Sequence, residues 1–139
     1  MLLSPYLYFD GRCEEAFHFY EKCLGGKITL MMTWGSSPTP VQAPPGWASK
    51  ILHAGLAAPD GGVLEGCDAM PGHYKKPASF CVMVRPKHAA EADQIFTALA
   101  EKGRVEIPIA KTFWALRFGK VVDRFGVPWL VNYENPLES

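Results

Sequence analysis

Residues 13–27 read CEEAFHFYEKCLGGK, and residues 87–104 read KHAAEADQIFTALAEKGR. In each stretch, apolar side chains recur at the spacing of one helical face, and the pattern ends in glycine followed by a basic residue. A Glu-Ala pair opens both helices, Glu15-Ala16 in the first and Glu91-Ala92 in the second. A unit that occurs twice in one chain predicts two paired modules.

Short strand patterns surround both helices in the same order, one before each helix and three after it. In the first half they cover residues 3–9, 27–34, 50–58 and 63–68, and in the second half residues 79–85, 105–109, 116–122 and 128–133. The sequence therefore predicts an α+β fold with two βαβββ modules, residues 1–68 and 78–139, joined by a linker at residues 69–77. Their mixed sheets are expected to curl around a shared cleft.

Turn signals lie between these elements. Asp10-Gly11 is predicted to cap the first helix, and residues 59–62, PDGG, to close a hairpin. In the second half, residues 123–127, DRFGV, match residues 60–63, DGGV, with one residue more. The proline-rich stretch at residues 35–49 is predicted to be an irregular loop or a lid.

Composition excludes several classes of protein. Fourteen basic residues balance fourteen acidic ones, so no net charge attracts a polyanion and nucleic-acid binding is not expected. The N-terminus lacks a basic region, and no apolar run reaches the roughly 18 residues that span a bilayer. The four cysteines form no C-x-x-C motif. We therefore expect a cytoplasmic protein with reduced thiols and no membrane partner.

Two motifs carry a family resemblance. Residues 19–27, FYEKCLGGK, resemble the first-helix signature of the glyoxalase and bleomycin-resistance (vicinal oxygen chelate) superfamily. Residues 123–132, DRFGVPWLVN, and Thr112-Phe113-Trp114 resemble the closing hairpin of its PhnB-like branch. The resemblance covers nearly the whole chain and implies the same two-module fold and a homodimer. Most members of this branch have no established activity.

The resemblance also gives positions for a metal site. Metal-dependent members hold one divalent ion with four side chains, two from each module. These positions fall on Pro5, Glu65, Ser79 and Leu130. Only Glu65 is an ordinary ligand, and one carboxylate does not hold a divalent ion against water. We therefore expect no metal and no other cofactor.

The same register predicts the lining of the cleft, because strand side chains alternate between two faces. Phe80, Val82 and Val84 are expected to face the second helix instead. A mainly apolar lining with a few polar groups is typical of a small-molecule pocket. The predicted ligand-binding residues are Leu7, Phe9, His53, Val63, Glu65, Cys67, Cys81, Met83, Leu130 and Asn132.

His53 and Glu65 are the candidate catalytic residues. They lie about two residue pairs apart across a predicted hairpin, so they could form an acid/base pair. A buried histidine that is only satisfied by hydrogen bonds, without chemistry, is the favoured interpretation. A nucleophilic role for Cys67 or Cys81 is the less favoured reading of those thiols.

Three functions compete on these residues. The favoured one is a binding module that sequesters or senses a small, partly apolar molecule. The alternative is a metal-dependent lyase, isomerase or dioxygenase with non-standard ligands, such as Glu65, His53 and a residue of a partner chain. A methyltransferase, the third, is not expected because no G-x-G-x-x-G motif follows a strand.

Overall fold

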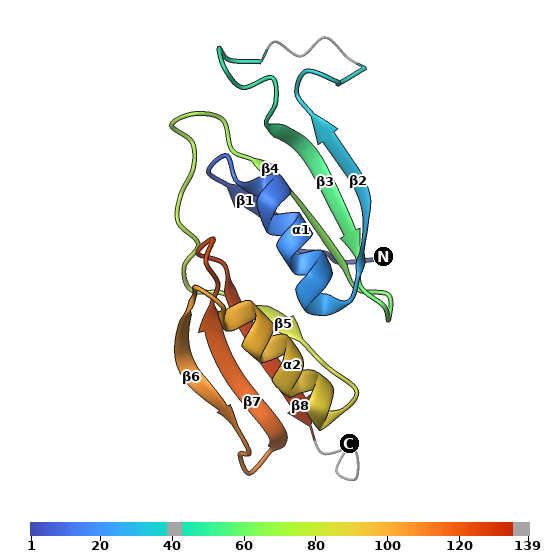
Figure 1. Cartoon of the computed structure of the whole chain (residues 1–139), viewed down its shortest axis with the longest axis vertical. Coiled ribbons are helices and arrows are strands. Elements are labelled where there is room, and N and C mark those ends of the chain that lie inside the picture. The colour runs from blue at the N-terminus through green and yellow to red at the C-terminus, as the bar shows by residue number, and fades with distance from the viewer. Residues whose placement is uncertain (39–42, 135–139) are drawn as a thin grey trace. The chain divides into compact units, whose positions relative to one another are not determined.

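The computed structural model describes residues 1–38 and 43–134 of the chain. These residues form two compact units, one within residues 1–75 and one within residues 76–139 (Figure 1). The boundary between the units falls inside residues 69–77, the stretch expected to be a linker. No helix in the described ranges is long and apolar enough to cross a membrane.

The first unit holds β1 (Tyr6–Phe9), α1 (Cys13–Leu24), β2 (Lys27–Thr33), β3 (Ile51–Ala57) and β4 (Val63–Asp68). Its strands lie in the order β1-β4-β3-β2. β1 runs parallel to β4, whereas β3 is antiparallel to both β4 and β2. α1 packs on one face of this sheet (Figure 1), and we call the opposite face the open face.

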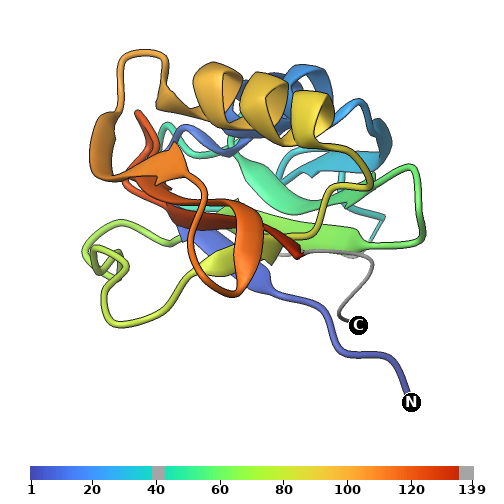
Figure 2. The ribbon, with the colours of Figure 1, turned by 90° about the horizontal axis from the view of Figure 1, so that it is seen from below.

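The second unit repeats this plan with β5 (Val82–Val84), α2 (Ala89–Ala100), β6 (Arg104–Ala110), β7 (Ala115–Val122) and β8 (Pro128–Glu134). Its order, β5-β8-β7-β6, is that of the first unit, with β5 parallel to β8. Figure 2 shows α2 lying over one face of this sheet. The predicted α+β fold of two βαβββ modules is confirmed.

Both helices bury the predicted apolar faces. In α1 the buried residues are Cys13, Ala16, Phe17, Tyr20 and Cys23, and in α2 they are Ala92, Ile95, Phe96 and Leu99. α1 ends at Gly25, whose φ of 68° is left-handed and favours glycine. The helical periodicity of the sequence therefore identified the core side of each helix correctly.

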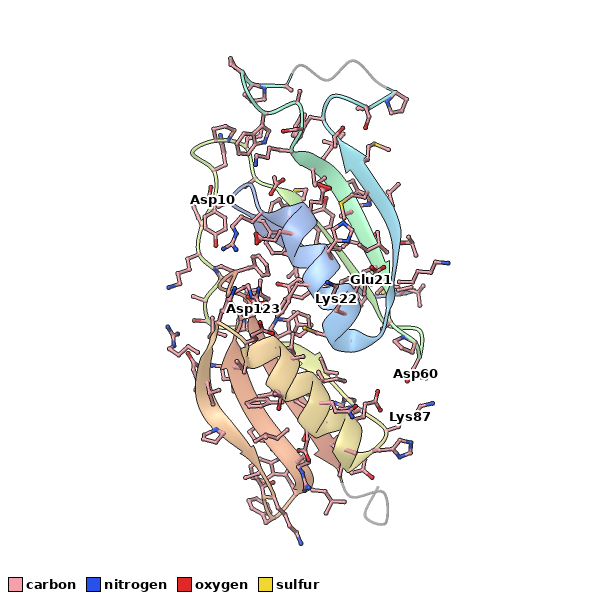
Figure 3. All side chains as sticks on the ribbon, viewed as in Figure 1. Asp10, Glu21, Lys22, Asp60, Lys87 and Asp123 are labelled. Atoms are coloured by element: carbon pink, nitrogen blue, oxygen red, sulfur yellow. The ribbon has the colours of Figure 1, made fainter. Side chains whose placement is uncertain are left out.

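The predicted cap of α1 is wrong. Residue Arg12 precedes the helix and makes no side-chain capping bond, and Asp10 is exposed (Figure 3). Instead, Asp68 at the end of β4 accepts a hydrogen bond from the backbone N–H of Cys13 (2.9 Å) and another from that of Ile51 (2.8 Å). A distant buried carboxylate thus satisfies a free N–H at the helix start and places a negative charge there.

The two hairpin turns align with each other in a different register from the one that the sequence match suggested. In the first turn the N–H of Ala58 bonds to the carbonyl of Gly62, and in the second the N–H of Asp123 bonds to that of Val127. Both turns are therefore equally long, and Asp123 takes the place of Ala58 rather than that of Asp60. Asp60 is exposed at the surface, whereas Asp123 lies among the side chains of its unit (Figure 3).

The first strand of the second unit is shorter than predicted. Ser79 has a φ of 62°, a left-handed conformation that does not fit an extended strand, and β5 begins only at Val82. Phe80 is correspondingly exposed, so its predicted packing under α2 is wrong. The buried side chains of this sheet under α2 come instead from the longer strands, above all Trp129 and Val131 of β8.

Candidate functional site

The ladder between β1 and β4 determines which side chains share the open face of the first sheet. Tyr6 lies opposite Glu65, and Tyr8 lies opposite Cys67. Residues that are opposite each other point to the same face, so these four side chains belong together. His53 joins them, because Gly55 pairs with Glu65 and His53 lies two positions away on the same strand.

Leu7 and Phe9 lie on the other face, so their predicted place in the pocket is wrong. They are only 3% and 2% exposed, and the Phe9 ring contacts the rings of Phe17 and Tyr20 in α1. The predicted register, with Pro5 on the cleft face, is one residue out of step, because Tyr6 lies opposite Glu65. The sequence held a usable signal, since within residues 6–9 the wholly apolar side chains alternate with tyrosines that suit a half-exposed face.

The polar groups of the open face form a continuous row. The Tyr6 hydroxyl lies 3.1 Å from Nδ1 of His53, and the two rings stack at 5.7 Å between centroids. Tyr6 also hydrogen-bonds the thiol of Cys67. At the other end, Nε2 of His53 lies 3.7 Å from Oε1 of Glu65. The row therefore runs Cys67, Tyr6, His53, Glu65.

The Tyr6 hydroxyl and the Cys67 thiol both keep their protons near neutral pH. Burial raises the pKa of the Tyr6 hydroxyl, and its hydrogen bond to Cys67 raises it further. Burial also raises the pKa of the Cys67 thiol, and the Tyr6 hydrogen bond offsets this only in part. A thiol that keeps its proton is a poor nucleophile. These two groups are therefore suited to hydrogen bonding and packing.

In the second unit, three of the predicted lining residues, Met83, Leu130 and Asn132, lie on one face of the sheet. Met83 lies opposite Leu130 in the β5–β8 ladder, and Asn132 lies two positions further along β8. Cys81 precedes β5 and is half-buried. Asn132 is buried and donates to Oε1 of Glu134 (3.2 Å), while its own Oδ1 is buried without a hydrogen-bond partner in the described part of the chain.

A charged group that the sequence reasoning missed also lies on that face. Lys120 of β7 is opposite Leu130, and its Nζ lies 2.9 Å from Oε2 of Glu106. Arg104 contacts the other oxygen of the same carboxylate at 3.0 Å. Both cations lower the pKa of Glu106. The charge of this carboxylate is therefore already balanced within its own unit.

The residues present do not fit the metal site of metal-dependent relatives. Of the four aligned positions, only Glu65 carries an ordinary ligand. The observed register puts Tyr6 rather than Pro5 opposite Glu65, and Ser79 lies outside β5. His53 is close enough to Glu65 to make a donor pair. Within residues 1–38 and 43–134, no three His, Cys, Asp or Glu side chains gather as a metal site needs. A pair of donors does not make a four-ligand site.

Comparison with known proteins gives the family. Residues 2–132 match the family described as 3-demethylubiquinone-9 3-methyltransferase. The chain belongs to this family. Protein YjdN of Escherichia coli (strain K12) is 34% identical over 140 residues, which cover 95% of each chain.

Solved structures share the fold of this chain. Protein PA1353 from Pseudomonas aeruginosa is 40% identical, with a TM-score of 0.87 over 96% of this chain and 98% of that chain. The PhnB protein from Bacillus cereus, 21% identical, has a TM-score of 0.78 over 96% and 99% of the two chains. Structures with the same fold also include a glyoxylase/bleomycin resistance protein/dioxygenase domain from Frankia. The predicted PhnB-like resemblance and the predicted fold are both confirmed.

Proposed function

We propose that this PhnB-like protein binds a small, partly apolar molecule on the open face of its first sheet, without the divalent metal of metal-dependent relatives. The observation that carries the proposal is the row of Cys67, Tyr6, His53 and Glu65. It places hydrogen-bonding groups from three strands among aromatic and aliphatic side chains, including Tyr8 and Val63. A few orienting polar groups on an apolar surface are the usual composition of a ligand site.

The raised pKa values of Tyr6 and Cys67 favour binding over covalent catalysis. Neither group supplies an anionic nucleophile near neutral pH. The face offers instead aromatic area and hydrogen bonds. A ligand that buries roughly 150 Å² of apolar surface gains about 4 kcal/mol before the cost of association, so the affinity of a fragment-sized probe should be no tighter than about millimolar.

The test is an NMR titration of the isotopically labelled full chain with 2-phenylethanol, a neutral probe with an apolar body and one hydroxyl. We expect saturable shifts of the backbone amides of Tyr6, His53, Glu65 and Cys67, and weaker binding by Tyr6→Ala. Tyr133→Phe in β8 is the control and should bind as the natural protein does. Shifts that do not saturate, or that leave these amides unmoved, would refute the proposal.

The absence of a bound metal is part of this proposal and has its own test. Elemental analysis of the purified protein is expected to find no stoichiometric Mn, Ni, Fe or Zn. About one ion per chain, lost in Glu65→Ala, would instead favour the metal-dependent lyase, isomerase or dioxygenase with non-standard ligands.

We also propose that the protein is a homodimer. β2 and β6 each form one edge of their sheet, and both expose apolar side chains, Leu30 on β2 and Val105 and Ile107 on β6. Edge strands with free backbone groups and apolar side chains are stabilised by covering them. Sedimentation equilibrium should give twice the 15.3 kDa of one chain. A monomer at micromolar concentration would contradict this proposal.

A further inference from the structure

We propose that the group recognised at the centre of this open face is an organic ammonium cation, and specifically a primary one. The inference rests on the proposed small-molecule function and narrows it to one charge class. Three observations carry it: two inclined tyrosine rings, a carboxylate that no Lys or Arg of the described residues pairs with, and the ring nitrogen of His53 beside that carboxylate.

The aromatic part of the site is formed by Tyr6 and Tyr8. Their ring centroids are 5.3 Å apart and their planes are inclined by 52°. Tyr6 is 39% exposed and Tyr8 is 56% exposed, so ring surface remains available to a ligand. A cation within about 6 Å of a ring centroid is attracted by the negative face of the ring. The exposed ring surface of both tyrosines is therefore available to a ligand cation.

The charge of the site comes from Glu65, opposite Tyr6 in the ladder. Its side chain is 41% exposed, and no Lys or Arg of the described residues pairs with it; its one ion-pair contact is His53. The second unit provides the contrast, since the carboxylate of Glu106 is already held by Lys120 and Arg104. Glu65 is therefore available to bind the cation of a ligand, whereas Glu106 is already paired with Lys120 and Arg104.

The hydrogen-bond row supplies two acceptors for the same ligand group. Nδ1 of His53 lies 3.1 Å from the Tyr6 hydroxyl, and which of the two groups donates depends on the tautomer of His53. In the neutral tautomer with the ring proton on Nδ1, Nε2 of His53 is an acceptor. Nε2 and Oε1 of Glu65 are 3.7 Å apart, too far for a bond between them. A primary ammonium group can donate to both.

A matched probe series separates these contributions. We would titrate the full chain with phenethylammonium, phenyltrimethylammonium, 2-phenylethanol and 3-phenylpropionate at one ionic strength and follow the same backbone amides. Phenethylammonium should bind about 5- to 20-fold more tightly than 2-phenylethanol. Phenyltrimethylammonium, which has no N–H donor, should fall between them, and 3-phenylpropionate should bind most weakly.

Variants assign the preference to named groups. Glu65→Gln should reduce phenethylammonium affinity by roughly fivefold and leave 2-phenylethanol unchanged. Tyr8→Leu should lower the affinity of both cations by about 2- to 5-fold. Glu106→Gln is the matched control, since it removes a β-sheet carboxylate that is partly exposed but already paired, and it should leave the preference intact.

The outcomes distinguish this inference from the proposed function. If 2-phenylethanol binds to the face as tightly as phenethylammonium, or if the preference survives in Glu65→Gln, the ammonium assignment is wrong and small-molecule binding stands. If none of the four probes shifts these amides, both the ammonium assignment and the proposed small-molecule binding are refuted. Should Glu65→Gln not fold, salt dependence replaces it: raising ionic strength must weaken phenethylammonium and spare the alcohol, and equal behaviour of the two would overturn the assignment.

Discussion

Tyr6 lies directly opposite Glu65 in the parallel ladder between β1 and β4, and its hydroxyl reaches His53 on β3 at 3.1 Å. One tyrosine thus connects three strands of the first sheet. A shift of β1 by a single residue would place Leu7 there and turn Tyr6 into the core. The candidate site therefore depends on the packing of Leu7 and Phe9 under α1 as much as on its own polar groups.

The capping role of Asp68 predicts a large loss of stability on mutation. Asp68→Ala leaves the buried N–H groups of Cys13 and Ile51 without their acceptor, so the free energy of unfolding should fall by about 2–4 kcal/mol. Asp10→Ala, at the position that the sequence suggested, should change it by less than about 0.5 kcal/mol. Urea unfolding followed by circular dichroism measures both, and similar effects for the two variants would contradict the observed cap.

Gly66 predicts a steric effect in the same ladder. A Cβ atom added there would lie 2.6 Å from the carbonyl oxygen of Leu7 and 3.1 Å from the Phe17 ring. Gly66→Ala should therefore lower the free energy of unfolding by about 1–3 kcal/mol. At Gly62 the added atom meets only Ala58, at an ordinary 3.5 Å, so Gly62→Ala is the control. Equal thermal midpoints for the two variants would show that the β1–β4 register is not as described.

Asp123 predicts that the two hairpin turns differ in their contribution to stability. Oδ1 accepts hydrogen bonds from the N–H groups of Phe125 and Val127, and Oδ2 accepts one from the indole N–H of Trp129 at 2.8 Å. Asp123→Ala should cost about 2–4 kcal/mol and change the fluorescence of the buried indole. Asp60→Ala, at the exposed position that the sequence match paired with it, should cost less than Asp123→Ala, because it removes a carboxylate at the surface rather than a buried one. Comparable losses would argue against this difference.

The buried thiol of Cys13 predicts lower stability at alkaline pH. Burial, together with the charge of Asp68, raises its pKa in the folded protein, whereas an unfolded thiol titrates near about 8.5. Above that pH the unfolded chain releases protons that the folded protein retains, so the free energy of unfolding falls by up to about 1.4 kcal/mol per pH unit per group. Cys67, whose pKa is also raised, adds to the slope.

The measurement is the urea midpoint between pH 7 and pH 10. Cys13→Ala should give a shallower decline above about pH 8.5, because it removes one of the titrating groups. Below about pH 8.5 the urea midpoints of the two proteins should change with pH in the same way. A variant that declines as steeply as the natural protein would show that Cys13 does not contribute.

The sequence by itself determined the elements and their repetition. The buried faces of α1 and α2, with Phe17, Tyr20, Ile95 and Phe96, follow from spacings within about a dozen consecutive residues. The glycine that ends α1 is a similarly local signal. Because the same order of elements occurs twice, the two-module fold followed from these local patterns together with the family resemblance.

Only the tertiary structure decided which side chains meet. Tyr6 and His53 are 47 positions apart, and Cys13 and Asp68 are 55 apart. The alternation within residues 6–9 indicates which side chains share a face, but no local pattern sets which residue of β4 lies opposite Tyr6, and counting from a motif across a loop carries an error of one residue. In a strand, that error moves every side chain to the opposite face. The fold was therefore readable from periodicity, whereas the row of Cys67, Tyr6, His53 and Glu65 required the packed sheet.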